Sequence, residues 1–454
     1  MRLRLVTGLT LGVLVLAGCS LFTDLSGLSG GPDDCEGGAC SDASPLDARG
    51  GGEGGGEAGD GDAAPCVPTD TVDPSLLSDV VALALGGGFS CALRTNGTVA
   101  CWGNNSNGLL GVQSPDRPTP GTVPGLSRIV AITAGLAFAC ALDADGHVWC
   151  WGDNTLGQLG QFPIGASSRP PAMVTAPGGQ PLANVTAIDA GEHHVCAIVS
   201  GAVWCWGAND MLQLGRPGGS APALVPSALP NPVELAVAGS YSCVIADGPT
   251  PPAKALYCWG ANDDNELAIT GGKTTTPQKI PVSLAAVGSY PVTSAGHGHA
   301  CARDEKDELW CWGENDFGQL GPNIPPGASP VPQSIDAFGM VRMAASGDDF
   351  SCAVAHDGTT RCLGENNNAQ LGNGMIDIVP PDSGPGPPHT DATVVSGLPP
   401  VSRIAAGVDH SCAILARSCP NAPGPVMCWG QNDLGELGSG TMKQSRVPVA
   451  VLAP

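Results

Sequence analysis

The sequence is poor in aromatic residues, in positive charge and in long apolar runs. Aromatic residues make up 4% of the 454 positions, so few core positions hold a large ring. Lys and Arg number 19 against 42 Asp and Glu, which gives a net charge of −23 at pH 7. Nucleic acids and anionic membrane surfaces recruit Lys and Arg, so we expect neither as a partner. The apolar stretch near the N-terminus, residues 5–17, is too short to cross a bilayer as a helix.

Glycine, proline and cysteine are abundant. The 66 glycines and 42 prolines favour short strands and tight turns over long helices. The 19 cysteines are too many for a reducing compartment unless metals hold them. The way the cysteines pair therefore bears on both the fold and the location.

The N-terminus is typical of an export signal. Two arginines precede the apolar stretch, which ends in Leu16-Ala17-Gly18-Cys19. This ending resembles the lipobox of bacterial lipoproteins, which implies that residues 1–18 are removed and that Cys19 carries lipid. An ordinary signal peptide with an incidental cysteine is the alternative. We expect an exported protein of the bacterial cell envelope, held at the outer membrane through its lipid alone.

Residues 19–78 have a different composition from the rest of the chain. Between residues 20 and 80 there are 13 acidic residues against one arginine, among many glycines and few aliphatic side chains. Such a segment cannot bury a core, so we expect a flexible acidic tether. The folded domain is expected over residues 79–454.

The rest of the chain repeats. A ten-residue string that mostly begins Trp-Gly occurs seven times, always with Asn fourth and Leu ninth. The first cysteines of successive copies are 47 to 60 residues apart, a period typical of β-propellers. The strings are WGNNSNGLLG from Trp102, WGDNTLGQLG from Trp151, WGANDMLQLG from Trp206, WGANDDNELA from Trp259, WGENDFGQLG from Trp312, LGENNNAQLG from Leu363 and WGQNDLGELG from Trp429.

Each copy contains material for four strands. In the second copy we expect strands over residues 129–134, 139–143, 147–151 and 171–175. The first is rich in small residues and suits the crowded innermost position around a central channel. The string bridges the third and fourth strands, where Asn can bond local backbone and Leu can hold the loop to the core.

Two cysteines flank the turn between the second and third strands of each copy. In three copies this turn has three residues ending in Gly, as in Thr95-Asn96-Gly97, which suits the positive φ of a bulged hairpin. Asp307 replaces that glycine in the fifth copy, and the third copy has the shorter turn Ser200-Gly201 with a cysteine spacing shorter by one residue. The cysteines therefore stay opposite each other, as a cross-strand disulfide requires. Zinc is the competing interpretation, but zinc knuckles place ligands roughly two to four residues apart. The expected links are Cys91–Cys101, Cys140–Cys150, Cys196–Cys205, Cys243–Cys258, Cys301–Cys311, Cys352–Cys362 and Cys412–Cys428.

The pattern Gly-x-x-His-x-Cys-Ala-Leu followed by Cys-Trp-Gly-x-Asn-x-x-Gly-Gln-Leu-Gly resembles the regulator of chromosome condensation repeat. It is more closely similar to the bacterial, exported, alpha-tubulin suppressor-like branch. The resemblance covers about residues 78–454. It implies an all-β fold, a seven-bladed propeller of four-stranded antiparallel blades.

Five cysteines lie outside the seven pairs. Cys19 is the expected lipid acceptor, and Cys35 and Cys40 are candidates to pair within the tether. Cys66 lies just before the first blade and Cys419 in the long hairpin tip of the last blade. Each of these two has no partner left except the other.

Histidines and acidic pairs are the remaining candidates for chemistry. His194, His299 and His410 stand two residues before a first cysteine, where we expect a flat ring that packs or hydrogen-bonds. The other copies have Phe89, Phe138, Tyr241 and Phe350 at this position. His297-Gly298-His299 could bind a metal weakly, but nothing in the sequence completes the set.

Asp263-Asp264 and Asp348-Asp349 lie in or beside turns, where carboxylates cap backbone amides. Acid–base catalysis would need two carboxylates converging in a pocket. No phosphate-binding loop and no Gly-x-Ser-x-Gly turn occurs in the sequence. We expect no catalytic residue, no metal and no cofactor.

The resemblance implies functions of two classes. The chromatin member of the family is a nucleotide-exchange factor for a small nuclear GTPase, but a lipobox and paired cysteines place this chain outside the cytoplasm. The exported bacterial precedent, the type II β-lactamase inhibitory protein, binds another protein through one propeller face and lacks this cysteine pattern. We expect a monomeric, non-enzymatic binding or scaffold protein that engages a protein partner. An exported lyase or hydrolase with a site at the channel mouth is the alternative, which acidic clusters around the channel would favour.

Loops that differ between copies are the expected recognition elements. Residues 176–184, 247–254 and 417–425 should emerge on one propeller face and border the recognition surface, and residues 376–389 should emerge on the other. Residues 447–452 match the fourth strand of the other copies. We expect them to pair into the first blade and close the ring, because an open propeller would leave an exposed edge.

Overall fold

The computed structural model describes residues 71–454 apart from gaps at 166–168, 228, 250–252, 285–292, 378–386 and 420–421. The chain divides into two compact units, residues 1–62 and 63–454, and every described residue belongs to the second. The expected signal at residues 1–18 and Cys19, Cys35, Cys40 and Cys66 lie outside the described residues. Within the described ranges, no helix has the length and apolar character needed to cross a membrane.

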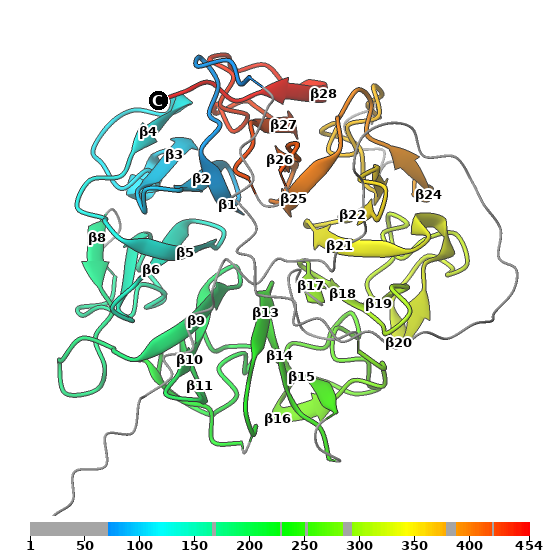
Figure 1. Ribbon diagram of the computed structural model, residues 1–454. Coiled ribbons are helices and arrows are strands. Elements are labelled where there is room, and N and C mark those ends of the chain that lie inside the picture. The colour runs from blue at the N-terminus through cyan, green and yellow to red at the C-terminus, as the bar shows by residue number, and fades with distance from the viewer. Residues whose placement is uncertain are drawn as a thin grey trace, which may run out of the picture. The chain divides into compact units, whose positions relative to one another are not determined.

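Seven four-stranded antiparallel sheets surround a central channel (Figure 1), which confirms the predicted fold. Each sheet is one blade and is built from four consecutive strands, the first of which lies nearest the axis. Two short 3-10 helices, η1 (Ser106–Gly108) and η2 (Asp336–Phe338), lie between strands. The blades are β1 (Val80–Leu85), β2 (Phe89–Arg94), β3 (Val99–Gly103) and β4 (Arg117–Thr122); β5 (Ile129–Ala134), β6 (Phe138–Asp143), β7 (Val148–Gly152) and β8 (Arg169–Met173); β9 (Val185–Ala190), β10 (His194–Val199), β11 (Ala202–Gly207) and β12 (Ala223–Leu224); β13 (Glu234–Ala238), β14 (Tyr241–Asp247), β15 (Lys254–Gly260) and β16 (Thr274–Lys279); β17 (Thr293–Ala295), β18 (His299–Arg303), β19 (Leu309–Gly313) and β20 (Ser329–Ser334); β21 (Val341–Ser346), β22 (Phe350–Ala355), β23 (Thr360–Gly364) and β24 (His389–Val394); β25 (Val401–Ala406), β26 (His410–Leu415), β27 (Val426–Gly430) and β28 (Ser445–Ala450).

The hairpin turns between second and third strands have the backbone conformations that their residues predict. Gly97 has φ +75°, and Asp307, which replaces glycine in the fifth blade, also adopts a positive φ of 63°. In the two-residue turn of the third blade, Ser200 and Gly201 have φ of 50° and 77°. Positive φ at both central residues gives a turn twist that matches the flanking strands. The cysteines on either side are therefore held in register.

All seven predicted hairpin disulfides are present, each between directly paired residues of the second and third strands. Their Cα–Cα separations are 4.1 to 4.2 Å. Cys419 is buried and also disulfide-bonded, but its expected partner Cys66 lies outside the described residues, so the 66–419 link stays a prediction. Each short-loop disulfide contributes about 2–3 kcal/mol by restricting the unfolded chain.

The loop after each third strand is held by its invariant Asn and Leu. In the second blade, the Asn154 side chain donates to the carbonyl of Gln161 and accepts the amide of Leu159 at 3.1 Å each. Leu159 is fully buried, as is the ninth residue of every other string. The string is therefore a structural loop that folds over the edge of its blade.

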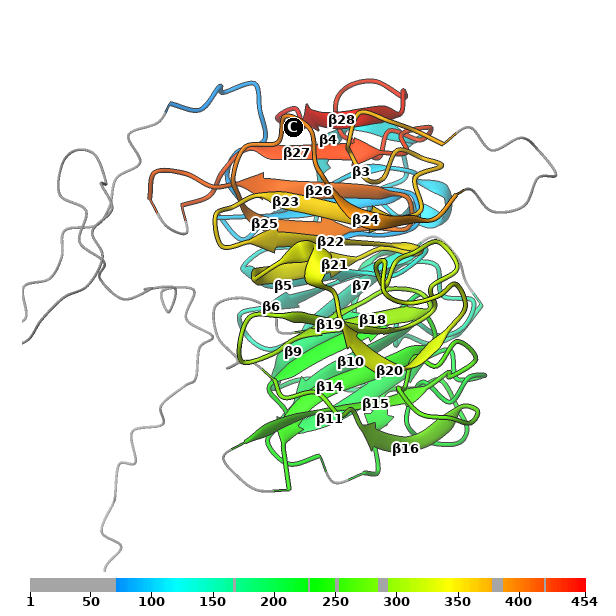
Figure 2. The ribbon, with the colours of Figure 1, turned by 90° about the vertical axis from the view of Figure 1, so that its right-hand side faces the viewer.

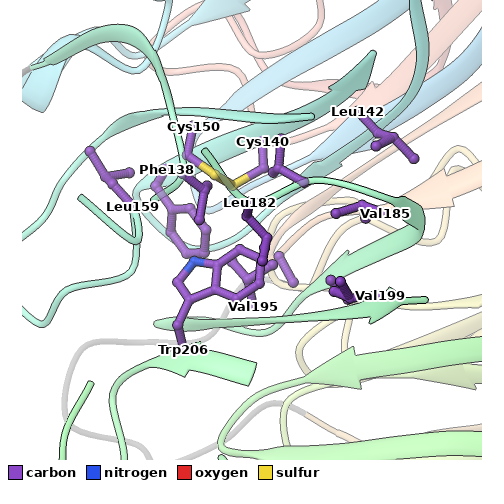
Figure 3. Close-up of a cluster of buried hydrophobic side chains, with 14 residues drawn as sticks. Phe138, Cys140, Leu142, Cys150, Leu159, Leu182, Val185, Val195, Val199 and Trp206 are labelled. Carbon is purple, nitrogen blue, oxygen red and sulfur yellow. A yellow bond between two sulfur atoms is a disulfide. The ribbon is translucent and has the colours of Figure 1, made fainter. Parts of the chain in front are cut away.

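Neighbouring blades are joined by the tryptophan of the string. The indole N–H of Trp206 donates to the carbonyl of Gln158 in the preceding blade at 3.1 Å. Figure 3 shows the contact between blades 2 and 3, where the Cys140–Cys150 disulfide and Leu182 pack near the Trp206 ring. The same donation, at 2.7 to 3.1 Å, occurs from Trp102 to Glu436, Trp151 to Leu109, Trp259 to Gln213, Trp312 to Glu266 and Trp429 to Gln370. Leu363 stands in place of the tryptophan in blade 6 and has no such donor.

The three histidines before first cysteines also link blades, as predicted for the flat-ring position. His194, His299 and His410 are buried, and each Nε2 lies 2.8 Å from a serine Oγ of the next blade around the ring. The serines are Ser242, Ser351 and Ser90, respectively. Burial lowers the pKa of His194 to about 3 and those of His299 and His410 to about 4, so all three are neutral at pH 7. They are structural residues.

The ring closes differently from the sequence prediction. The C-terminal residues form β28, which pairs with β27 of its own blade and not with blade 1. The prediction is wrong because each copy carries all four of its strands in order. Blade 1 therefore lacks no strand that the C-terminus could supply.

Residues before β1 make the closing contacts instead. The Leu77 amide donates to the carbonyl of Val451 at 3.0 Å, and the Leu77 carbonyl accepts the amide of Val426 at 3.0 Å. The Ala453 amide donates to the carbonyl of Ser75 at 2.7 Å. Leu77 is buried in a cluster shared by the first and last blades. The packing of the propeller thus begins a few residues before the expected boundary at 79.

The propeller has two chemically different ends. What we call the hairpin end carries the tips between second and third strands and the connectors between blades; the tip after β26 projects on this side in Figure 2. Tips rest on connectors there, as where the Ser200 amide donates to Asn184 and the Asp247 amide to Pro230. What we call the acidic end carries the turns between first and second strands and the loops between third and fourth strands. Residues 176–184 and the described parts of 247–254 and 417–425 therefore share the hairpin end, as predicted.

Candidate functional site

A cavity of about 520 Å³ runs into the centre of the ring. Its walls are the innermost strands, which present mainly small and aliphatic side chains such as Leu83, Ile132 and Ile188. Two carboxylates interrupt this wall. That of Asp189 accepts the hydroxyl of Thr133 and the amide of Val237 from the two flanking blades. That of Glu234 accepts the amide and the hydroxyl of Thr293 from the next blade. Burial raises the pKa of Asp189 to about 6. The channel wall is thus mainly apolar, with two carboxylates that link neighbouring blades.

The mouth at the acidic end has a polar half and an apolar half. Each first turn begins with Gly, and the residue after it lines the mouth in most blades. Gly87, Leu136 and Val408 line the mouth from blades 1, 2 and 7. The opposite half is lined by Glu192, His297 and Asp348 from blades 3, 5 and 6.

His297 lies between the two carboxylates. Its Nδ1 is 3.1 Å from Asp348 Oδ1, and its Nε2 is 3.6 Å from Glu192 Oε1. The hydrogen bond to Asp348, aided by the charge of Glu192, raises the pKa of His297 to about 9. With 52% of its side chain exposed, the ring is open to solvent and to solutes.

The turn of blade 4 brings these residues together. The first turn is Gly239-Ser240 in this blade, one residue shorter than Gly191-Glu192-His193 in blade 3. The Glu192 amide donates to the carbonyl of Gly239 at 3.1 Å, and a Cβ on Gly239 would lie 2.2 Å from the carbonyl of His297. Blades 3 and 5 therefore approach each other across the shortened turn.

More carboxylates surround this group. Burial, with repulsion from Asp348 and Glu314, raises the pKa of Asp349 to about 8. Burial, with repulsion from Asp409, raises the pKa of Glu365 to about 7. Burial also raises the pKa of Glu314 and that of Asp409. The carboxylates around the channel mouth are partly buried and repel one another, so their charged forms are poorly solvated. This favours the binding of protons or other cations at the mouth.

The whole acidic end has an excess of negative charge. Its described turns and loops contain 16 acidic residues against three basic ones, Arg216, Lys273 and Lys443. Four exposed aspartates occupy the fifth position of the string, namely Asp210, Asp263, Asp316 and Asp433. A cationic ligand or surface is attracted to this end by the long-range field.

The sequence identifies only part of this group. Asp348-Asp349 and His297 are candidates from the sequence, but His297 and His299 diverge in the structure, since His299 is buried against Ser351. The residues around Glu192 in the sequence do not mark it as a site residue, because its position beside His297 depends on the ring bringing blades 3 and 5 together. The one-residue deletion in the fourth copy is the signal that could point to it. Asp264 adds a further carboxylate near Glu314 and His297.

The arrangement offers three kinds of chemistry. A protonated imidazole between two carboxylates can exchange protons, a carboxyl with a pKa near 8 can act as an acid at neutral pH, and the same ligand atoms can hold a cation. The adjoining cavity gives space for a bound molecule beside them.

Comparison with known sequences identifies relatives of the repeat region. Residues 48–385 match the RCC1-like domain family. Human E3 ubiquitin-protein ligase HERC2 is 31% identical over 284 residues, which are 59% of this chain and 5% of HERC2. The ultraviolet-B receptor UVR8 of Arabidopsis thaliana is 27% identical over 282 residues, which are 59% of this chain and 58% of UVR8. The chain therefore spans less than two thirds of the length of these relatives.

Solved structures show the same fold. Prp20p from Saccharomyces cerevisiae matches with a TM-score of 0.64 at 23% identity, over 79% of this chain and 87% of that one. Human WBSCR16 matches with a TM-score of 0.62 at 20% identity, over 79% of this chain and 94% of that one. The family match over residues 48–385, which covers more than half of the chain and contains the first five blades, shows that this chain belongs to the RCC1-like domain family.

Proposed function

We propose that this chain is an exported, lipid-anchored binding protein that engages a protein partner through the hairpin end of its propeller. The observation that carries the proposal is that three loops that depart from the repeat, residues 176–184, 247–254 and 417–425, share that end. The four-stranded sheets recur in every blade and the Trp–carbonyl bond in six of the seven, so differences in recognition are expected to come from the loops. The Prp20p structure is described together with binding to Gsp1p and histones, which is a precedent for protein binding by a related fold.

Residues 176–184 form an ordered protrusion suited to recognition. The Ala176 amide donates to the carbonyl of Gln180 at 2.8 Å, and Thr175 bridges to Pro181. Residues 177–181 are all exposed. Beside the base of this protrusion, Phe162 is 57% exposed and lines a second cavity of about 510 Å³. A pre-formed loop next to an exposed ring lowers the entropy cost of binding a partner.

The other two loops contribute differently. At residues 247–254 the base of the tip is held by the Asp247–Lys254 ion pair at 2.7 Å. The tip at 417–425 packs inward instead, because Cys419 and Gly424 are buried and Gly424 pairs with Val80. This third loop supports ring closure, so it is left intact in the test below.

The test is a pull-down from envelope and secreted fractions with the full chain. Replacing residues 177–180 and 248–253 with Ser-Gly turns should abolish capture of any specific partner and shift the melting temperature by no more than a few degrees. Asp316→Asn with Met442→Ser, both exposed at the acidic end, is the matched control and should leave capture intact. Loss of capture in the control, with retention in the loop variant, would assign binding to the opposite end.

A second candidate function is supported by the acidic rim. An exported lyase or hydrolase would use the channel mouth, where Asp349, with a pKa of about 8, directly follows Asp348 in the wall of the 520 Å³ cavity. Turnover of polysaccharide or ester substrates that Asp349→Asn abolishes, without loss of the fold, would favour this enzyme over the binding protein.

A further inference from the structure

Glu192, His297 and Asp348 form a group with the composition and spacing of metal ligands. One nitrogen of His297 and one oxygen from each carboxylate lie within 4.8 Å of one another. Within the described ranges, this is the one place where three such side chains converge in this way. The three residues come from three different blades and meet only because the ring is closed.

The spacing is compatible with a metal after small side-chain rotations. Bonds of about 2.1 Å in a tetrahedral site place ligand atoms about 3.4 Å apart. The contacts of His297 to Asp348 and Glu192 are 3.1 and 3.6 Å, although they involve different ring nitrogens. Binding through a single nitrogen therefore needs the imidazole to turn, which its 52% exposure allows, and to release to solvent the proton that it carries between the two carboxylates.

The composition of the rim and its charge also distinguish this group. The other four positions that follow the first glycine of a turn carry no ligand, since they are Gly87, Leu136, Ser240 and Val408. The charged side chains that act on His297 most strongly are carboxylates, namely Asp348, Glu192 and Asp349. A divalent cation at the channel mouth would therefore neutralise part of the negative charge of these carboxylates.

We propose that Glu192, His297 and Asp348 bind one divalent transition-metal ion of the zinc type at the channel mouth, with a coordination position open toward the cavity. One imidazole nitrogen with two carboxylate oxygens suits zinc and its neighbours better than calcium or magnesium, which take oxygen ligands. Three protein ligands leave a fourth position for water or for an incoming ligand. The half-exposed imidazole provides the entry path from solvent. This inference is independent of partner capture at the hairpin end.

The experiment uses the full chain, purified and freed of metal with a chelator. Titration with Co²⁺, followed by its visible absorption, and calorimetry with Zn²⁺ should each show one ion bound per chain. His297→Ala and Asp348→Asn should each weaken binding about tenfold or more, the scale on which losses at metal sites are measured. His356→Ala is the matched control, because His356 is 53% exposed and paired with Asp307 at 2.9 Å at the hairpin end. This control should bind with unchanged affinity.

Three outcomes would overturn the proposal. The first is the absence of stoichiometric binding by the folded wild-type chain. The second is unchanged affinity in His297→Ala, which would assign binding to carboxylates elsewhere. The third is displacement of Zn²⁺ by Ca²⁺ at equal concentration, which would show that the imidazole is not a ligand. Melting curves of both variants, which alter partly exposed side chains, separate loss of the site from loss of the fold.

Discussion

Replacing Glu266 with Gln should stabilise the propeller, and by more at higher pH. Glu266 is the eighth residue of its string, where four other copies have Gln. It is 4% exposed, and its Oε2 accepts the amide of Asp264 at 3.0 Å. The glutamines make the same bond through Oε1, as Gln158 does with the amide of Leu156 at 2.9 Å. The substitution therefore preserves the contact and removes only the charge.

The magnitude follows from the pKa of Glu266. Burial is the main cause that raises this pKa from 4.5 to about 7, with repulsion from Asp264 and Asp263 adding to it. The folded state thus binds the proton more tightly than the unfolded state, so the free energy of unfolding falls as pH rises from 4.5 to 7. The Glu266→Gln variant avoids this loss, which amounts to about 1 kcal/mol at pH 5 and about 3 kcal/mol at pH 8.

The assay is thermal unfolding of the oxidised protein at pH 5, 6, 7 and 8. For a propeller of this size the gain at pH 8 corresponds to about 4 °C in melting temperature. Glu305→Gln, which removes an exposed carboxylate from a hairpin tip, is the matched control. A gain for Glu266→Gln that is equal at pH 5 and pH 8, or a loss at pH 8, would refute the reasoning.

Two further predictions concern the blade contacts and the anchor. Ser411→Ala should stabilise the fold by about 1 kcal/mol, because its buried Oγ has no hydrogen-bond partner among the described residues, whereas Ser242→Ala should destabilise it by about 1–3 kcal/mol by leaving the ring of His194 without its partner. Chemical denaturation that gives both variants the same sign would contradict this account. Cys19→Ala should release the protein from membranes, and globomycin should accumulate an uncleaved precursor. Fractionation that finds the variant still fully membrane-bound would rule out the lipid anchor.

Local features of this fold can be predicted from the sequence, and features that depend on the closed ring cannot. Turn length and cysteine spacing vary together, so the hairpin register, including the positive φ of Asp307, follows from a few residues of sequence. The flat-ring position also identifies His194 as structural. The indole donation of Trp206 escapes prediction, because its acceptor at Gln158 belongs to another blade. Glu192 escapes it for the same reason.

The way the ring closes also cannot be predicted from the sequence. The fourth strand of the last copy is recognisable in the sequence, but its expected partner lies in the wrong blade. Leu77 occupies a position that recurs three residues before other innermost strands, as Leu126 and Leu182 do, but the sequence does not show that its own partners lie in the last blade. Its burial against Val451 and Val426 becomes evident only from the closed ring.

The closing contacts also determine how the propeller would respond to mechanical load. Any pull on the chain from its N-terminal side enters the described domain through residues 71–77. It acts first on the backbone bonds that join Ser75 and Leu77 to Val426, Val451 and Ala453. The force therefore acts on the last blade before it reaches β1. The first and last blades bear it together. A propeller tethered at its N-terminus would thus resist drag through its final blade.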